Sequence, residues 1–274
     1  MYKELPDHGR IWNRIESLLD TRKPDWRQTV EDLGQVKAVM DRRAGKSWSD
    51  DEIFEGLLRS VLSNNTDWAR VETVLPELSN VFNGLSLKSY ANLPKEEVGS
   101  RIVPWFKKRR AGSNTLRRSL EYLIQASQIL LAWSIKYGSA EKYFLGLMQH
   151  AQGDPKRAAI KMGSCSSQYK LPAFGVALAA EALRNIGFDL AKPDRHILRS
   201  VGAFGLMEFS RWVDRRGTKP PNPTTAELLE SMAIIEKLAI SAGEYTSLVD
   251  NAIWMTCAKS GLHLSNDALK EMAI

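Results

Sequence analysis

The architecture of this chain is most readily inferred from one run of residues, Tyr169-Lys170-Leu171-Pro172-Ala173-Phe174-Gly175-Val176-Ala177. A proline followed by small residues and a glycine favours a tight turn, and the alanine-rich segment 174–186 that continues from it favours a helix. The first backbone N–H groups of a helix have no acceptor within it and point outward. The run therefore predicts a turn whose free amides can hold a phosphate group.

A second informative run follows this helix and its terminal Gly187: Lys192-Pro193-Asp194-Arg195-His196-Ile197-Leu198-Arg199. Asp194 directly precedes a segment with helical spacing that extends to about Gly202. Aspartate is a preferred N-cap residue, because its carboxylate accepts hydrogen bonds from the first amides of a helix. From residue type alone, capping is the simplest role for Asp194, and it is compatible with a chemical role.

Helical signals also occupy the rest of the chain. Ser49 with Glu52 forms a capping box, and the apolar residues that follow it at helical spacing are Ile53, Phe54, Leu57, Leu58, Val61 and Leu62. Segment 113–137 has the same spacing and is ended by Gly138. A second capping box, Thr224 with Glu227, predicts a helix that runs to Gly243.

Prolines mark the expected breaks in this pattern. We expect Pro76 to bend or divide a helix over 67–82, and Pro104 to lie near the end of a helix that begins after Pro94. The sequence contains no alternating run of β-branched residues bounded by turns. The predicted fold is therefore all-α.

The amino-acid composition excludes several classes of protein and of functional site. The 274 residues include 38 Lys or Arg against 32 Asp or Glu, and 43% are hydrophobic, which is typical of a soluble globular protein. With only Cys165 and Cys257, a disulfide scaffold or an all-cysteine metal site is excluded, and a cytoplasmic location is expected. The four histidines lack metal-ligand spacing, and neither a phosphate-binding glycine loop nor a Gly-x-Ser-x-Gly motif occurs. No secretory signal or bilayer-length apolar run is found, so we expect no membrane association.

In the two runs quoted above, the chain resembles the helix-hairpin-helix DNA glycosylase superfamily, whose members excise bases from DNA. The hairpin of that family reads Leu-Pro-Gly-apolar-Gly, and this chain has Leu-Pro-Ala-Phe-Gly at 171–175. The family's catalytic aspartate lies in a segment like Val-Asp-Thr-His-apolar-x-Arg, which 193–199 matches with Asp194. Upstream, 62–67 resembles the family's Leu-Ser-x-Gln-x-Thr-Asp segment, and 102–111 resembles its aromatic turn with a basic-alanine pair.

The resemblance implies a role for each matched position. Asp194 is the implied catalytic carboxylate, which stabilises positive charge on the sugar as the base leaves and orients the attacking water. Asn64 and Asn65 correspond to the wedge that fills the gap left by the extruded nucleotide. The implied DNA-binding residues are Lys170, Leu171, Pro172, Ala173, Phe174, Gly175, Val176, Asn64, Asn65, Arg109 and Arg110.

Two departures from the family pattern affect the expected chemistry. Ala173 stands where the hairpin has its first glycine, and alanine resists the positive φ that glycine adopts. Ala177 stands where bifunctional members carry the lysine that forms a Schiff base, so that covalent intermediate cannot form here. The family's four-cysteine iron-sulfur cluster is missing as well. The resemblance thus implies a monofunctional enzyme without lyase activity, metal or other cofactor.

Plain structural roles compete with several of these assignments. Asn64 and Asn65 could simply end a helix, because asparagine accepts left-handed and turn conformations. The basic run 107–110 would be an ordinary solvated helix end in a protein that bound no DNA. Four tryptophans near element ends are candidates for stacking on an extruded base: Trp48, Trp68, Trp105 and Trp212.

The expected function is a monofunctional DNA glycosylase that flips out a damaged, mismatched or modified base of double-stranded DNA and hydrolyses its N-glycosidic bond. It would leave an abasic site, in repair or in defence against phages with modified bases. The alternative is a non-catalytic helix-hairpin-helix DNA-binding module. We expect a monomer with a helical barrel domain over 49–187, a second, discontinuous helical domain over 1–48 and 188–274, and an active-site cleft between these lobes.

Overall fold

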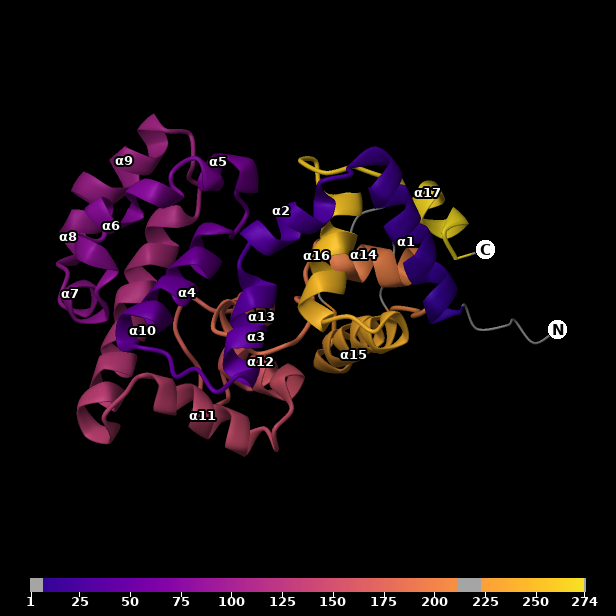
Figure 1. Ribbon diagram of the computed structural model, residues 1–274. Coiled ribbons are helices and arrows are strands. Elements are labelled where there is room, and N and C mark those ends of the chain that lie inside the picture. Colours follow the sequence, from indigo (N-terminus) through magenta and orange to yellow (C-terminus); the bar gives the residue numbers. More distant parts are fainter. Residues whose placement is uncertain (1–6, 211–222, 274) are drawn as a thin grey trace. The chain divides into compact units, whose positions relative to one another are not determined.

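Helices make up every regular element in residues 7–210 and 223–273, the parts of the chain that the computed structural model describes (Figure 1). The all-α prediction is confirmed. The chain divides into two compact units, one formed by Met1–Met40 with Gly187–Ile274 and the other by Asp41–Ile186. We call them the terminal unit and the central unit. The hairpin turn 171–175 lies in the central unit, whereas Asp194 lies in the terminal unit.

The terminal unit combines helices from both ends of the chain. They are α1 (His8–Arg22), α2 (Trp26–Asp32), α3 (Gln35–Arg43, which continues into the central unit), α14 (Arg195–Ala203), α15 (Thr225–Ala242), α16 (Thr246–Cys257) and α17 (Asn266–Glu271). The α1 helix, indigo in Figure 1, packs against α15 and α16, which are drawn in gold. Since nearly every residue of α16 is buried, this helix forms the core of the terminal unit.

The central unit contains the remaining elements. They are α4 (Asp50–Leu62), α5 (Trp68–Glu72), η1 (Leu75–Glu77), α6 (Leu78–Val81), η2 (Asn83–Leu85), α7 (Leu87–Ala91), α8 (Lys95–Glu97), η3 (Val98–Ile102), α9 (Val103–Lys108), α10 (Leu116–Tyr137), α11 (Glu141–His150), α12 (Pro155–Gly163) and α13 (Val176–Asn185). The buried α4 packs against α10 and α13, and α13 packs against α12. These contacts fix the two helices that flank the hairpin turn.

The helix caps and the apolar positions that the sequence predicted are present in the structure. At the start of α4, Ser49 N donates to Glu52 Oε2 at 2.8 Å, and Glu52 N donates to Ser49 Oγ at 3.3 Å. The same reciprocal pair of bonds joins Thr224 and Glu227 at the start of α15. Gly138 ends α10 with a left-handed φ of 89°. All six apolar positions predicted for α4 are buried.

Pro76 and Pro104 differ in how they affect the helices around them. Pro76 lies in η1, which separates α5 from α6, so the segment 67–82 is divided rather than continuous. The helical stretch that begins after Pro94 comprises α8, η3 and α9 without a break and ends at Lys108, so Pro104 lies four residues before its end. The unexpected feature is that this proline follows η3 directly, in the first turn of α9.

Across residues 7–210 and 223–273, no helix combines the length and the apolar character needed to span a membrane.

Candidate functional site

The hairpin turn 171–175 connects α12 to α13 and is anchored by its apolar side chains. Leu171 and Phe174 are buried, and Leu171 N donates to Met162 O of α12 at 3.3 Å. Gly175 is exposed. Although the family resemblance groups Leu171 and Phe174 with the DNA-binding residues, their side chains lie in the core. These two residues therefore offer a ligand no side chain, and their backbone N–H groups already donate to Met162 O and Leu171 O.

The N-terminus of α13 has the features expected of an anion-binding turn. Its N-cap residue is Gly175, which has no side chain that could accept from the first-turn amides. The preceding helix approaches closely here, because a Cβ atom on Gly163 would lie 2.6 Å from the Cα and N atoms of Val176. Unpaired amides at a helix N-terminus attract negatively charged groups. This arrangement supports the phosphate-holding role predicted for the turn.

Ala173 adopts the conformation that its residue type disfavours. Its φ is 75°, in the left-handed region that glycine populates readily. The hairpin thus keeps the positive φ at the position of the family's first glycine, with alanine in place. Burial of the flanking Leu171 and Phe174 holds the turn in this conformation despite the strain.

We expect Ala173→Gly to stabilise the protein by about 1 kcal/mol, because relief of left-handed strain outweighs the added entropy of the unfolded chain. Urea denaturation followed by circular dichroism measures the change. Ala179→Gly in the regular part of α13 is the matched control, and it should destabilise by about 1 kcal/mol. If Ala173→Gly lowered the free energy of unfolding, the backbone of Ala173 would not be strained in the folded protein.

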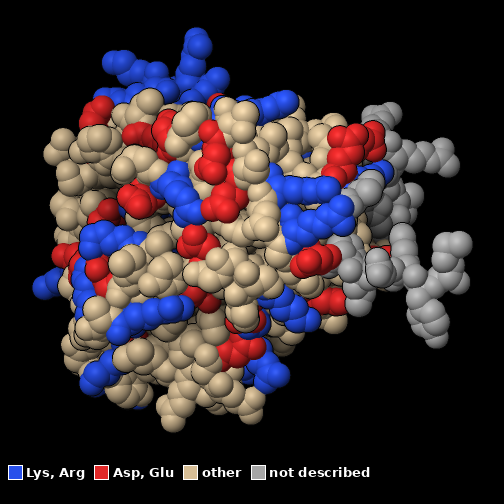
Figure 2. Space-filling model, turned by 45° about the vertical axis from the view of Figure 1, so that its right-hand side comes forward, with Lys and Arg blue, Asp and Glu red and all other residues tan. Residues whose placement is uncertain are grey.

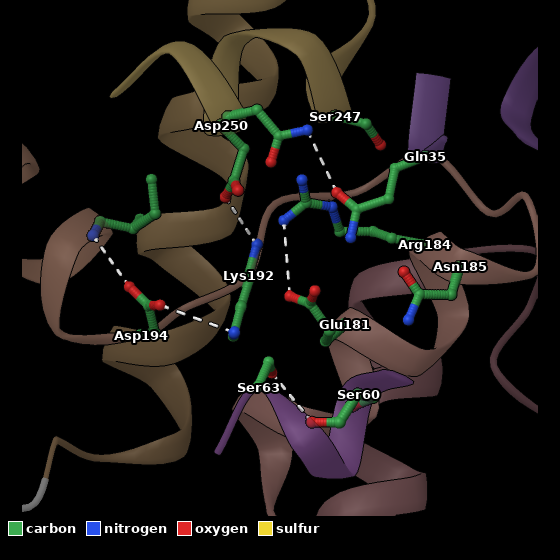
Figure 3. Close-up of polar contacts among 12 residues, drawn as sticks. Gln35, Ser60, Ser63, Glu181, Arg184, Asn185, Lys192, Asp194, Ser247 and Asp250 are labelled. Atoms are coloured by element: carbon green, nitrogen blue, oxygen red, sulfur yellow. Dashed lines mark hydrogen bonds and ion pairs between the residues drawn. The ribbon is translucent and has the colours of Figure 1, made fainter. Parts of the chain in front are cut away.

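Asp194 forms the predicted N-cap of α14. Its Oδ1 accepts from His196 N at 2.7 Å and from Ile197 N at 3.4 Å. Oδ2 lies 3.8 Å from Nζ of Lys192, as Figure 3 shows. The side chain is 22% exposed. One oxygen therefore fixes the carboxylate to the helix, while the other faces the ammonium group of Lys192.

The segment that leads to Asp194 is attached to α16 by two carboxylates. Asp250, which is 3% exposed, accepts from Lys192 N at 2.8 Å (Figure 3). Asp189 accepts from Ser247 N at 2.9 Å and from Ser247 Oγ at 3.0 Å. Asp250 belongs to none of the sequence motifs that indicate a function. A carboxylate inside an otherwise largely apolar helix is the signal that could have identified it.

Burial changes the proton affinity of two side chains in these runs. It lowers the pKa of the His196 imidazole below its ordinary value, and the Asp194 carboxylate opposes this shift. Burial also lowers the pKa of the Lys170 ammonium. Lys170 Nζ donates to the backbone oxygen of Phe174 and, at 3.1 Å, to that of Gly163. Its amine is therefore directed at the protein backbone.

The proposed wedge follows α4. Asn64 N donates to Val61 O at 3.2 Å, and Asn65 has a left-handed φ of 53° and an exposed side chain. Asparagine adopts this conformation readily at the end of a helix, so the observation agrees with a purely structural role for Asn65. The exposed amide of Asn65 is also the kind of group that a wedge needs.

The structure distinguishes between the two arginines predicted to contact DNA. Arg109 donates to Glu77 Oε2 at 2.7 Å, and its guanidinium carbon lies 4.0 Å from the ring centre of Trp105. Arg110 is exposed, with a φ of 55°. Arg110 is thus the better placed of the two for a phosphate. On the face drawn in Figure 2, basic and acidic residues are interspersed rather than gathered into one stripe.

The tryptophans proposed for base stacking differ in their availability. Trp48 is 9% exposed, and Lys46 Nζ lies 4.4 Å from its ring centre. Trp105 is covered by Arg109, and Trp68 is half-buried. Trp212 lies outside the described residues. Trp48 therefore serves the core, and its position does not favour stacking on a base.

No family model matches the chain, and no curated protein matches it. Among solved structures, the 8-oxoguanine DNA glycosylase of Thermotoga maritima is similar with a TM-score of 0.58 and 20% identity, over 92% of this chain and 98% of that one. The 8-oxoguanine glycosylase/lyase of Methanocaldococcus jannaschii, solved with a 15mer DNA containing 8-oxoguanine, is similar with a TM-score of 0.56 and 19% identity, over 89% and 94%. This degree of similarity establishes a shared fold.

Proposed function

We propose that this chain, which has the helix-hairpin-helix DNA glycosylase fold, is a DNA glycosylase acting on double-stranded DNA. It flips out an aberrant base and hydrolyses the bond between that base and deoxyribose, which leaves an abasic site. It acts as a monomer in the cytoplasm and requires no metal or organic cofactor.

The observation that carries the proposal is the way in which the carboxylate of Asp194 is held. Two backbone amides of α14 fix Oδ1, so the side chain is oriented before any substrate binds. Departure of the base leaves positive charge on the sugar, and a preoriented carboxylate stabilises that charge without reorganisation. The same group can orient the water that attacks the anomeric carbon.

Ala177 supports hydrolysis over lyase chemistry. The residue lies in the first turn of α13 and provides no amine for a Schiff base with the sugar. The Methanocaldococcus jannaschii protein is a glycosylase/lyase, so the fold accommodates both reactions. We therefore assign this chain the water-dependent reaction, with strand cleavage only when alkali is added.

The chemical nature of the base determines whether the role is repair or defence. An oxidised, alkylated, deaminated or mismatched base would indicate repair, whereas a base carrying a large modification would indicate defence against phages with modified DNA. The two structural neighbours act on 8-oxoguanine, which makes this base the first member of the test panel.

The test is a panel of end-labelled duplexes, each with one altered base, incubated with the protein and then treated with or without hot alkali. We expect cleavage of at least one duplex only after alkali, because an abasic site is alkali-labile. Duplex binding without excision across the whole panel would instead support the non-catalytic module. Absence of duplex binding at low salt would contradict both functions, since phosphate contacts dominate such binding.

A further inference from the structure

One half-buried ammonium group, that of Lys170, is directed at the backbone of the hairpin segment rather than at solvent alone. Lys170 immediately precedes the turn, and its Nζ donates to the carbonyl oxygen of Gly163 at 3.1 Å and to that of Phe174. Gly163 is the last residue of α12, and Phe174 is two residues before the first residue of α13. A single side chain therefore connects the end of one helix to the turn that begins the next.

Electrostatics explain why a cation stabilises this position. The C-terminal carbonyls of a helix such as α12 carry partial negative charge, and an ammonium group near them is favourable. Converging carbonyl oxygens also attract cations in general. Hydrogen bonds from a charged donor are about twice as strong as those between neutral groups. Lys170 therefore restrains a turn that contains the strained Ala173.

We propose that Lys170 is a positioning residue for DNA binding, which acts through the Gly163 and Phe174 carbonyls rather than by contacting a phosphate. This inference rests on the proposed function and revises the DNA-contact role that the resemblance implied for Lys170. The hydrogen bonds hold the turn so that the first amides of α13 keep one orientation. The ammonium, being part of the chain, does this at every ionic strength.

Direct contact with a phosphate and positioning of the turn predict different salt dependences of the affinity for DNA. Removing a lysine that contacts a phosphate lowers the slope of log affinity against log salt by about 1. Removing a positioning lysine weakens binding and leaves that slope unchanged. We would measure the affinity of Lys170→Met for a short undamaged duplex at several salt concentrations, together with hydrogen exchange at the amides of 171–177. Lys161→Met is the matched control, because it removes the same charge from neighbouring α12.

For Lys170→Met we expect at least tenfold weaker binding, an unchanged salt slope and faster exchange in the turn, with normal exchange there in Lys161→Met. Lys170→Arg provides the second variant and covers the case in which Lys170→Met does not fold. The planar guanidinium retains the charge, but it is larger and its donors form a fixed fork, which does not match two carbonyl bonds that converge on one nitrogen atom. It should therefore also weaken binding and accelerate exchange in the turn.

Three results would overturn the inference. They are a salt slope lowered by about 1 in Lys170→Met, wild-type affinity in Lys170→Arg, and unchanged exchange in the turn of both variants. Failure of the proposed function has a different signature, because wild-type protein would then either bind no duplex or bind duplexes without excising a base from any member of the panel. Hydrogen exchange would still report whether Lys170 restrains the turn.

Discussion

Asp194→Asn is expected to lower the rate of base excision by roughly 100-fold or more, while duplex affinity and the unfolding transition remain those of the wild type. Asparagine is as good an N-cap as aspartate, so its side-chain oxygen can still accept from His196 N and Ile197 N. The substitution therefore removes the negative charge and keeps the helix end. Single-turnover excision assays and fluorescence anisotropy measure the two effects.

Asp7→Asn is the matched control for this variant. Asp7 caps α1 by the same kind of bond, since Oδ1 accepts from Gly9 N at 2.9 Å. The control loses the same charge from another N-cap of the terminal unit and should retain full activity. Undiminished excision in Asp194→Asn would refute the catalytic assignment, whatever the base.

Ala177→Lys is expected to give the protein the lyase activity that a monofunctional wild type would lack. The new amine would attack C1′ of the sugar as the base leaves, and opening of the ring would give an imine between Nζ and C1′. Loss of a proton from C2′ then expels the 3′ phosphate and breaks the strand. Borohydride reduces the imine, so a covalent protein–DNA complex on a denaturing gel measures its formation.

The control for this gain of activity is Val176→Lys, one position earlier in the first turn of α13. Successive residues of a helix point in directions about 100° apart, so this amine should not reach the same atom. A borohydride-trapped complex with wild-type protein would show that another amine acts as a nucleophile, and the monofunctional proposal would then be wrong.

Local signals account for the parts of the fold and site that the sequence predicted. The capping bonds of Ser49 and Asp194 join residues two or three positions apart, so residue type and spacing suffice to predict them. The same holds for the left-handed Gly138 at the end of α10. The hairpin turn could be located because Pro172 fixes its own φ and because Gly175, a residue type accepted at N-caps, precedes the first residue of α13.

Contacts between residues that are far apart in the sequence could not be predicted from such local signals. Arg109 pairs with Glu77, 32 positions earlier, and Lys192 N bonds to Asp250, 58 positions later. Only the packing of helices decides which of many carboxylates meets a given donor. The conformation of Ala173 belongs to the same class, since residue preference argued against a positive φ and the buried neighbours impose it.

The attachment of residues 187–194 to α16 has a consequence for naturally occurring or selected variants of this protein. The carboxylate of Asp194, our proposed catalytic group, belongs to a stretch that is bonded to α16 through Asp189 and Asp250. A change at Asp250 would leave a backbone amide without its acceptor and shift the aspartate two residues later in the chain. Loss-of-function substitutions should therefore occur in α16 as well as at the proposed DNA-binding residues, although α16 begins more than 50 residues after Asp194 in the sequence.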